Sequence, residues 1–146
     1  MIKFEQMSGE MKEMLADDIF SSRLKLLIIM AKAYLIGYPI GKYRKQAIIE
    51  NAHNVFYRSI QFVNEFVSWE NYRLDAQADV ISKGGASTVH FFHQRVQLLS
   101  VMVKAMVEDY PMGKYRKRSL KENLDKICET LIFNFQMKDV NFLKVA

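Results

Sequence analysis

Hydrophobic residues recur at spacings of three and four along most of this 146-residue chain. One pair of stripes comprises Phe20, Leu24, Leu27, Ala31 and Leu35, and Phe92, Val96, Leu99, Val103 and Val107. A second pair comprises Ile48, Ala52, Val55, Ser59/Ile60 and Val63, and Leu120, Leu124, Ile127, Leu131/Ile132 and Phe135. Such spacing places apolar side chains on one face of an α-helix. It predicts four helices, over roughly residues 10–36, 42–66, 88–108 and 114–138.

These stripes belong to an internal repeat with an offset of 72 residues. Residues 26–60 align with residues 98–132, and 15 of the 35 aligned positions are identical. Seven of the identities lie in one phrase, which reads YPIGKYRK at 38–45 and YPMGKYRK at 110–117. We interpret the repeat as the duplication of a helical hairpin within one domain.

Two such hairpins predict a single all-α domain over residues 1–146, an antiparallel up-down four-helix bundle. Hairpin 1 is expected at about 10–67 and hairpin 2 at about 88–138, with a linker at about 68–87. This topology places both copies of the phrase at one end. The acidic residues expected toward the other end are Glu5, Glu10, Glu13, Asp17, Asp18, Glu65, Glu70, Asp75 and Asp79.

The phrase has the features of a helix stop followed by a helix start. Gly37 suits a left-handed C-terminal cap, and Pro39 is expected at the first position of the next helix. A start one residue later would let Tyr38 and Tyr43 pack together as a hydrophobic staple. In the second copy Asp109 replaces Gly37 and is a poorer cap. Capping therefore explains the Tyr-Pro-x-Gly part of the phrase.

The charge distribution points to an anionic partner. The chain has 21 Lys and Arg against 16 Asp and Glu, a net charge of +5 and a pI near 9.3. The phrase places cations in the first turn of a helix, where the helix dipole already makes the potential positive. Capping does not explain a doubled Lys-Tyr-Arg-Lys, whereas a bound anion, most simply phosphate, does. The candidate nucleic-acid-binding residues are Lys42, Tyr43, Arg44, Lys45, Lys114, Tyr115, Arg116, Lys117 and Arg118.

Two roles are open for Tyr43 and Tyr115. They can stack on bases, as aromatic residues do in proteins that bind single strands. Aromatic residues beside a helix turn more often pack beneath the loop, and we expect that arrangement here.

Few residues are candidates for catalysis. His90 and His93 share a helix face but have no third ligand at metal-binding spacing, and Cys128 lies beside an apolar stripe without a histidine base. We expect Cys128 to be a core thiol. No P-loop, dinucleotide fingerprint or catalytic triad is present, so we expect no enzyme, catalytic residue, metal or cofactor. The sequence predicts neither a signal peptide nor a transmembrane helix, and its single cysteine fits a cytoplasmic location.

Several of these features together resemble two related bacterial protein groups. They are the aromatic-Pro turn, the basic-aromatic helix start, Arg95 with Leu98 and Leu99 in the third helix, and the tyrosine near the start of the fourth. The groups are the accessory variability determinant proteins of diversity-generating retroelements and the small proteins encoded in intervening sequences of large-subunit ribosomal RNA genes. The resemblance covers roughly residues 20–135. It implies a four-helix bundle that forms homopentamers and, for the retroelement group, nucleic-acid binding beside a reverse transcriptase.

The sequence and the resemblance together predict a non-enzymatic accessory protein that scaffolds RNA or an RNA/cDNA hybrid for a reverse transcriptase. The expected partners are nucleic acid, a reverse transcriptase and further copies of the chain. The alternative is a protein-interaction module of a phage or mobile element whose basic end docks an acidic partner. Contact with an anionic membrane surface is a third role, which no strongly amphipathic terminal helix supports.

Overall fold

The computed structural model of the chain describes residues 18–39, 41–61, 69, 71–83, 89–108 and 113–135. Most of these residues lie in five helices: α2 (Asp18–Leu35), α3 (Lys42–Gln61), α4 (Leu74–Lys83), α5 (Val89–Val107) and α6 (Lys114–Phe135). No strand occurs in this part of the chain, so the all-α prediction is confirmed. The predicted helical stretches 10–17, 62–66 and 136–138 lie outside the described residues.

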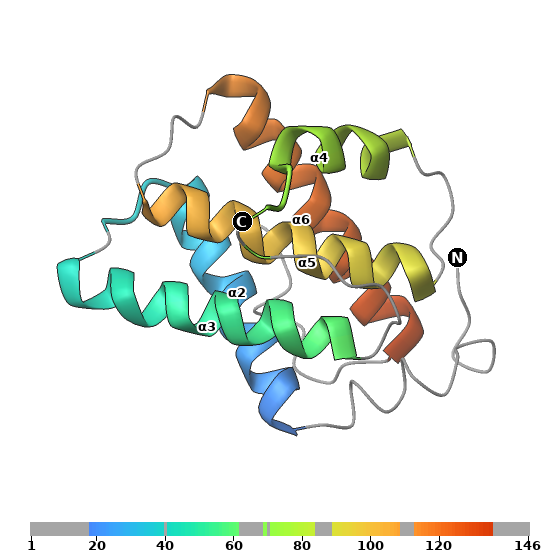
Figure 1. Cartoon of the computed structure of the whole chain (residues 1–146), viewed down its shortest axis with the longest axis horizontal. Coiled ribbons are helices and arrows are strands. Elements are labelled where there is room, and N and C mark those ends of the chain that lie inside the picture. Colours follow the sequence, from blue (N-terminus) through green and yellow to red (C-terminus); the bar gives the residue numbers. More distant parts are fainter. Residues whose placement is uncertain are drawn as a thin grey trace.

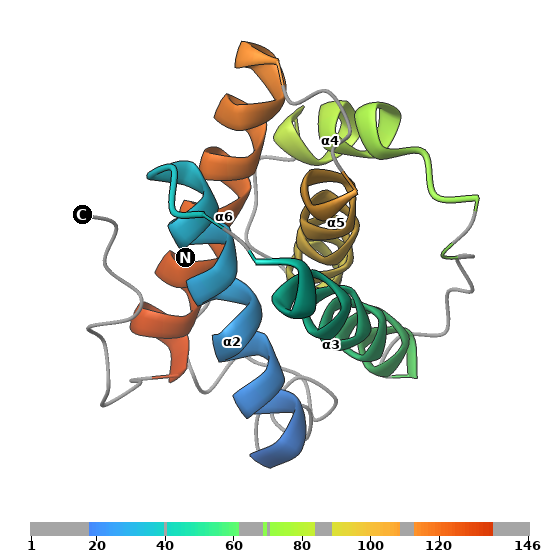
Figure 2. The ribbon, with the colours of Figure 1, turned by 90° about the vertical axis from the view of Figure 1, so that its left-hand side faces the viewer.

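The helices form two crossing layers and a cover. Helices α3 and α5 lie side by side in opposite directions and make the most extensive contact in the molecule (Figure 1). Helices α2 and α6 form a second layer, also antiparallel, which crosses the first steeply (Figure 2). Helix α4 lies over α5 and α6. The result is a helical bundle whose four predicted helices are splayed instead of aligned.

Helix α5 lies at the centre of the bundle. It contacts each of the other four helices. From Phe92 to Val107 every residue is buried except Gln94 and Lys104, which are half-buried. Its counterpart in the repeat, α2, lies at the edge and leaves Ile19 and Ile29 exposed. The two copies of the first helix of the hairpin therefore occupy different environments.

The described members of all four predicted stripes point into the core, whereas Val63 and the side chains of Ile132 and Phe135 lie outside the described residues. In α2 and α5, Phe20, Leu24, Leu27, Ala31, Phe92, Val96, Leu99, Val103 and Val107 are buried. In α3 and α6, Ile48, Ala52, Val55, Ser59, Leu120, Leu124, Ile127 and Leu131 are buried. Leu35 is partly buried against the core. Burial of one apolar face is the main source of stability for helices of this length.

Helix α4 lies in the segment expected to be a linker, residues 68–87. Its apolar residues Leu74, Ala78 and Ile81 are spaced four and three apart, which is the helical pattern in a short form. Ile81 is fully buried, and the other two pack against the core. A helix of ten residues is too short to be stable alone in water, so α4 depends on this packing.

Candidate nucleic-acid interface

The first copy of the phrase begins where α2 ends. Gly37 has a φ of 80°, the left-handed conformation that a glycine adopts at little cost. The N–H of Gly37 donates to the carbonyl of Tyr34, and the N–H of Tyr38 donates to the carbonyl of Ala33, both at 2.9 Å. This pair of bonds is a Schellman motif. The predicted cap at Gly37 is therefore confirmed.

The two basic helices start in the same register. The N–H of Lys45 donates to the carbonyl of Gly41, and the N–H of Lys117 donates to the carbonyl of Gly113, both at 3.1 Å. Each glycine is therefore the N-cap of its helix. The prediction that Pro39 opens the helix at its first position is wrong, because Pro39 precedes α3 by three residues. The side chain of Tyr43, and with it the proposed staple, lies outside the described residues.

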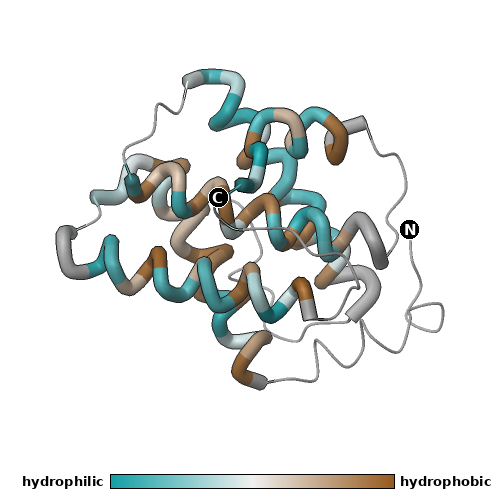
Figure 3. The backbone as a smooth tube through the Cα atoms, in the orientation of Figure 1, coloured by the Kyte–Doolittle hydropathy of each residue, from teal (hydrophilic) through white to brown (hydrophobic). Residues whose placement is uncertain are grey.

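Most of the described cations at the two helix starts face solvent. Arg44, Lys114, Lys117 and Arg118 are exposed, while Lys45 is half-buried. Lys42 opens α3, but its side chain lies outside the described part of the structure. Neither first turn contains an acidic residue, and the first turn of α6 is hydrophilic (Figure 3). Free first-turn N–H groups and basic side chains together make each start an attractive place for an anion.

Tyr115 lies on the surface of α6. Its side chain is 81 % exposed. The expectation that this tyrosine packs beneath the loop is wrong, because α6 turns its side chain away from the core. An exposed aromatic ring between cations offers a stacking surface for a base.

Arg116 differs from the other candidate cations. Its Nε donates to Oδ1 of Asp75 at 3.0 Å, and its Nη2 donates to Oδ2 at 2.7 Å. This two-bond fork lowers the pKa of Asp75 below its ordinary value, mainly through the hydrogen bonds from Arg116. The prediction that Asp75 falls at the end away from the basic residues is therefore wrong. The error follows from treating residues 68–87 as a linker, because α4 carries Asp75 back to the start of α6.

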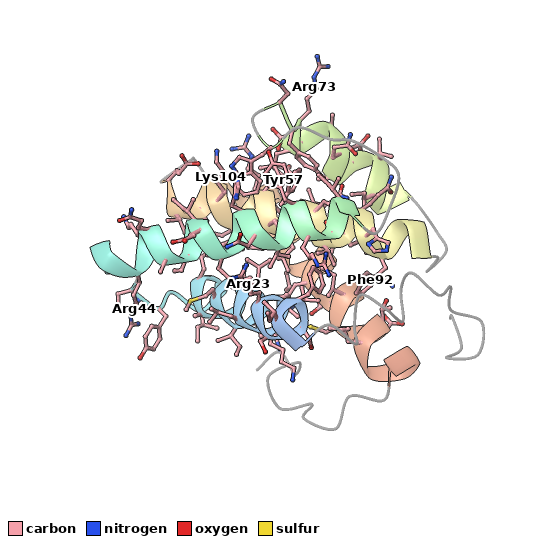
Figure 4. The ribbon with its side chains drawn as sticks, turned by 60° about the horizontal axis from the view of Figure 1, so that its bottom comes forward. Arg23, Arg44, Tyr57, Arg73, Phe92 and Lys104 are labelled. Carbon is pink, nitrogen blue, oxygen red and sulfur yellow. The ribbon has the colours of Figure 1, made fainter. Side chains whose placement is uncertain are left out.

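The basic starts of α3 and α6 lie on one side of the molecule but are separate from each other. Figures 1 and 2 show α6 beginning beside α4, whereas α3 begins well below it. Figure 4 shows Arg44 at the start of α3 and Arg73 projecting from the body of the molecule beside α4. We call the exposed start of α3 around Arg44 the first patch, and the start of α6 around Tyr115 and Arg116 the second patch.

The other candidate residues are buried or dispersed. Cys128 is buried, and burial raises the pKa of its thiol to about 11, so the neutral thiol predominates at neutral pH. His93 is buried in the core beside the ring of Phe92. Within the described residues, no three His, Cys, Asp or Glu side chains lie close enough to hold a metal ion. None of the described helices combines the length and apolar character needed to cross a lipid bilayer.

Sequence reasoning missed two features of this interface. Asp75 was assigned to the wrong end, although the apolar spacing of Leu74, Ala78 and Ile81 was a signal for the helix that carries it. The second feature is a cavity of about 380 Å³ beside Arg116, lined in part by Trp69 and Lys104. It is formed by residues from α4, α5, α6 and the segment before α4, so no short sequence motif marks it.

Comparison with known proteins adds no assignment. The chain matches no protein-family model, no curated protein and no solved structure.

Proposed function

We propose that this protein is a non-enzymatic, cytoplasmic accessory protein that binds RNA or an RNA/cDNA hybrid through the phosphate backbone. The observation that carries the proposal is that α3 and α6 both begin with Gly-Lys-Tyr-Arg-Lys in the same register. Each start holds free N–H groups and cations without an acidic residue in its first turn. Cations at a helix start are unfavourable for the helix, but they favour the binding of a phosphate there.

The mode of binding that these residues support is reading of charge and shape. Arg44, Lys114, Lys117 and Arg118 supply contacts to phosphates, and exposed Tyr115 supplies a stacking surface. The sequence contains no recognisable base-reading motif. We therefore expect weak sequence preference and strong dependence on salt.

The wider role rests on the sequence resemblance. We propose that the two hairpins descend from a duplicated unit and form an antiparallel four-helix core, to which α4 is added. Like the accessory proteins of diversity-generating retroelements, the chain is proposed to form a homo-oligomer, a pentamer by resemblance, and to scaffold nucleic acid for a reverse transcriptase. Several copies would multiply the number of phosphates contacted at once.

The test is a salt titration of binding to a labelled structured RNA and to DNA of the same sequence. We expect a log–log slope of several units, because each phosphate contacted contributes about 0.7 to 0.9. Tighter binding to RNA than to DNA is the result expected for the retroelement role. A matched variant carries Gln at Lys42, Arg44, Lys45, Lys114, Arg116 and Lys117, and its helicity is checked by circular dichroism. Undetectable binding of the wild-type protein at low salt overturns the proposal.

A second candidate function, a protein-interaction module, is favoured by the outer face of α2. Ile19, Leu26, Ile29 and Ile36 are 67, 42, 44 and 69 % exposed. The spacing of Ile19, Leu26 and Ile29 puts them on one side of α2, and Ile36 directly follows the end of the helix. An exposed apolar stripe of this kind suits contact with a protein surface. A variant with Leu26→Glu and Ile29→Glu should then lose a protein partner or self-association, measured by sedimentation, without losing nucleic-acid binding.

A further inference from the structure

The two copies of the phrase differ in whether the arginine is paired with a carboxylate. Arg44 and Arg116 are equivalent residues, 72 positions apart. Arg116 is held in a two-bond fork by Asp75, whereas no carboxylate of the described residues pairs with Arg44. A planar guanidinium uses the same fork to bind a phosphate. The carboxylate of Asp75 therefore occupies the position on Arg116 that a phosphate oxygen pair would take.

The Asp75–Arg116 pair is accessible from two sides. It forms part of the lining of two cavities, of about 380 and 330 Å³. Lys104 and Arg73 line the first cavity, and Tyr115 and Arg118 line the second. The side chain of Asp75 is 68 % exposed, so breaking the pair requires only a side-chain movement. Tyr115 and Arg118 line the same cavity as Arg116, so a phosphate bound beside them lies near its guanidinium.

Helix α4 places two carboxylates against the second patch. Asp75 and Asp79 both line the cavity that contains Tyr115 and Arg118. Asp75 lies in the first turn of α4, where the helix dipole stabilises a carboxylate, so it remains charged at neutral pH. No described carboxylate takes the corresponding place at the first patch. Among the described residues, the two basic starts of the repeat therefore differ: an internal anion pairs with the second, and no carboxylate pairs with Arg44 at the first.

We infer that Asp75 is an internal competitor for phosphate at Arg116, so that nucleic acid engages the first patch directly and the second patch only after exchanging with Asp75. The inference rests on the proposed function, because it assumes that phosphates of a nucleic acid bind at these helix starts. The exchange moves Arg116 from one anion to another and leaves the charge of the protein unchanged. The inference predicts that the protein binds nucleic acid more weakly than its number of exposed cations suggests.

The test compares Asp75→Asn with Asp125→Asn in full-length protein. Both substitutions remove one negative charge, but Asp125 lies nine residues beyond Arg116 on α6, roughly 13 Å along the helix. Binding of a labelled RNA is measured by anisotropy at several salt concentrations. We expect Asp75→Asn to bind about two- to fivefold more tightly than Asp125→Asn, the range that an exposed ion pair supports. Its salt slope should rise by at most about 0.7 to 0.9, because phosphate contacts Arg116 in only part of the wild-type complexes.

Arg116→Gln tests whether the tighter RNA binding of Asp75→Asn depends on the arginine. Added to Asp75→Asn, it should remove the whole gain in RNA affinity. In wild-type protein it should cost less RNA affinity than Arg44→Gln. Circular dichroism and the fluorescence of Trp69, the chain's single tryptophan and a neighbour of Arg116 in the larger cavity, check that each variant is folded. Asp75→Ser repeats the measurement if the amide variant folds poorly.

The outcomes separate the inference from the proposed function. RNA binding that is equal in the Asp75→Asn and Asp125→Asn variants overturns the inference and leaves the proposed function standing. A gain that survives Arg116→Gln also overturns it, because the carboxylate then acts elsewhere. Absence of RNA binding in the wild-type protein and in every variant at low salt overturns the proposed function itself.

Discussion

The side-chain amide of Asn123 donates a hydrogen bond of 3.0 Å to the backbone carbonyl of Arg95. Asn51 makes the same bond to the carbonyl of Arg23, also at 3.0 Å. Each bond joins the two helices of one hairpin and spans 28 residues. The sites differ in burial, because Asn123 is only 3 % exposed while Asn51 is half-buried. Equivalent positions of the sequence repeat therefore make the same interaction in two environments.

Replacing each asparagine with alanine should separate the effect of burial. We expect Asn123→Ala to lower the free energy of unfolding by about 1–2 kcal/mol, and Asn51→Ala by less than about 1 kcal/mol. The buried site cannot replace the lost bond with water, whereas the half-buried site can. Urea unfolding of the two variants measures both values. Equal losses would contradict the argument from burial.

Gly37→Ala should destabilise the protein through backbone conformation alone. An added Cβ would meet no atom within 4 Å, but the φ of 80° is unfavourable for alanine. We expect a loss of about 1–2 kcal/mol in the free energy of unfolding. Gly37→Asn should cost less, because asparagine tolerates this conformation. Gly37→Asn is therefore the matched control, because it too adds a Cβ at this open site. An asparagine variant that costs as much as Gly37→Ala would contradict the explanation.

Arg44→Gln should stabilise the protein, whereas Arg116→Gln should leave its stability unchanged or lower it. Removing Arg44 relieves an unfavourable charge at the start of α3, so we expect a gain of roughly 0.3–1 kcal/mol. Removing Arg116 also breaks the fork to Asp75, which joins α6 to α4. That loss, up to about 1 kcal/mol for an exposed pair, offsets the gain or exceeds it. Thermal unfolding at low salt measures both, and equal gains for the two variants would show that the fork adds no stability.

Alkaline pH should weaken the fold through Cys128. Burial raises the pKa of its thiol to about 11, above the value of about 8.5 in an unfolded chain. The unfolded state therefore ionises first, so stability is complete below pH ~8.5 and falls as pH rises toward 11. Burial also raises the pKa of Tyr72, which adds to the loss above pH ~10. Cys128→Ala should flatten the fall between pH ~9 and 11, measured by urea unfolding. An unchanged slope would contradict this assignment.

Most of the fold could be predicted from hydrophobic spacing because each long helix buries one continuous face. The predicted starts at residues 42 and 114 match the first residues of α3 and α6. Helix α4 was missed because it has ten residues and only three apolar positions on its buried side, and because it follows no repeat. The crossing of the two layers was missed for a different reason. Hydrophobic spacing shows which face of a helix is buried, but not the angle at which two helices cross.

The candidate interface was predictable only where its residues are consecutive. The phrase placed the cations at helix starts because glycine and basic residues occur at fixed positions in both copies. The fork between Arg116 and Asp75 joins residues 41 positions apart. The phrase could not reveal that Asp75 pairs with Arg116, because its two copies are nearly identical in sequence. Only the second copy lies beside α4. The exposure of Tyr115 was likewise decided by how α6 sits on the bundle.

Tyr115→Ala should weaken nucleic-acid binding without weakening the fold. The ring is 81 % exposed, so its removal changes the free energy of unfolding by less than about 0.5 kcal/mol. If a base stacks on it, the loss in RNA affinity is about 1–3 kcal/mol, roughly five- to 150-fold. Tyr115→Phe retains the ring and should bind nearly as well as wild type.

Heparin is the matched ligand, because it offers a polyanion without bases. Stacking predicts that Tyr115→Ala binds heparin as the wild-type protein does while losing RNA. A parallel loss for both ligands would instead show that Tyr115 positions the neighbouring cations. Unchanged RNA binding would remove Tyr115 from the interface and leave phosphate contacts as the whole of the interaction, since stacking is the one contribution there that does not depend on charge.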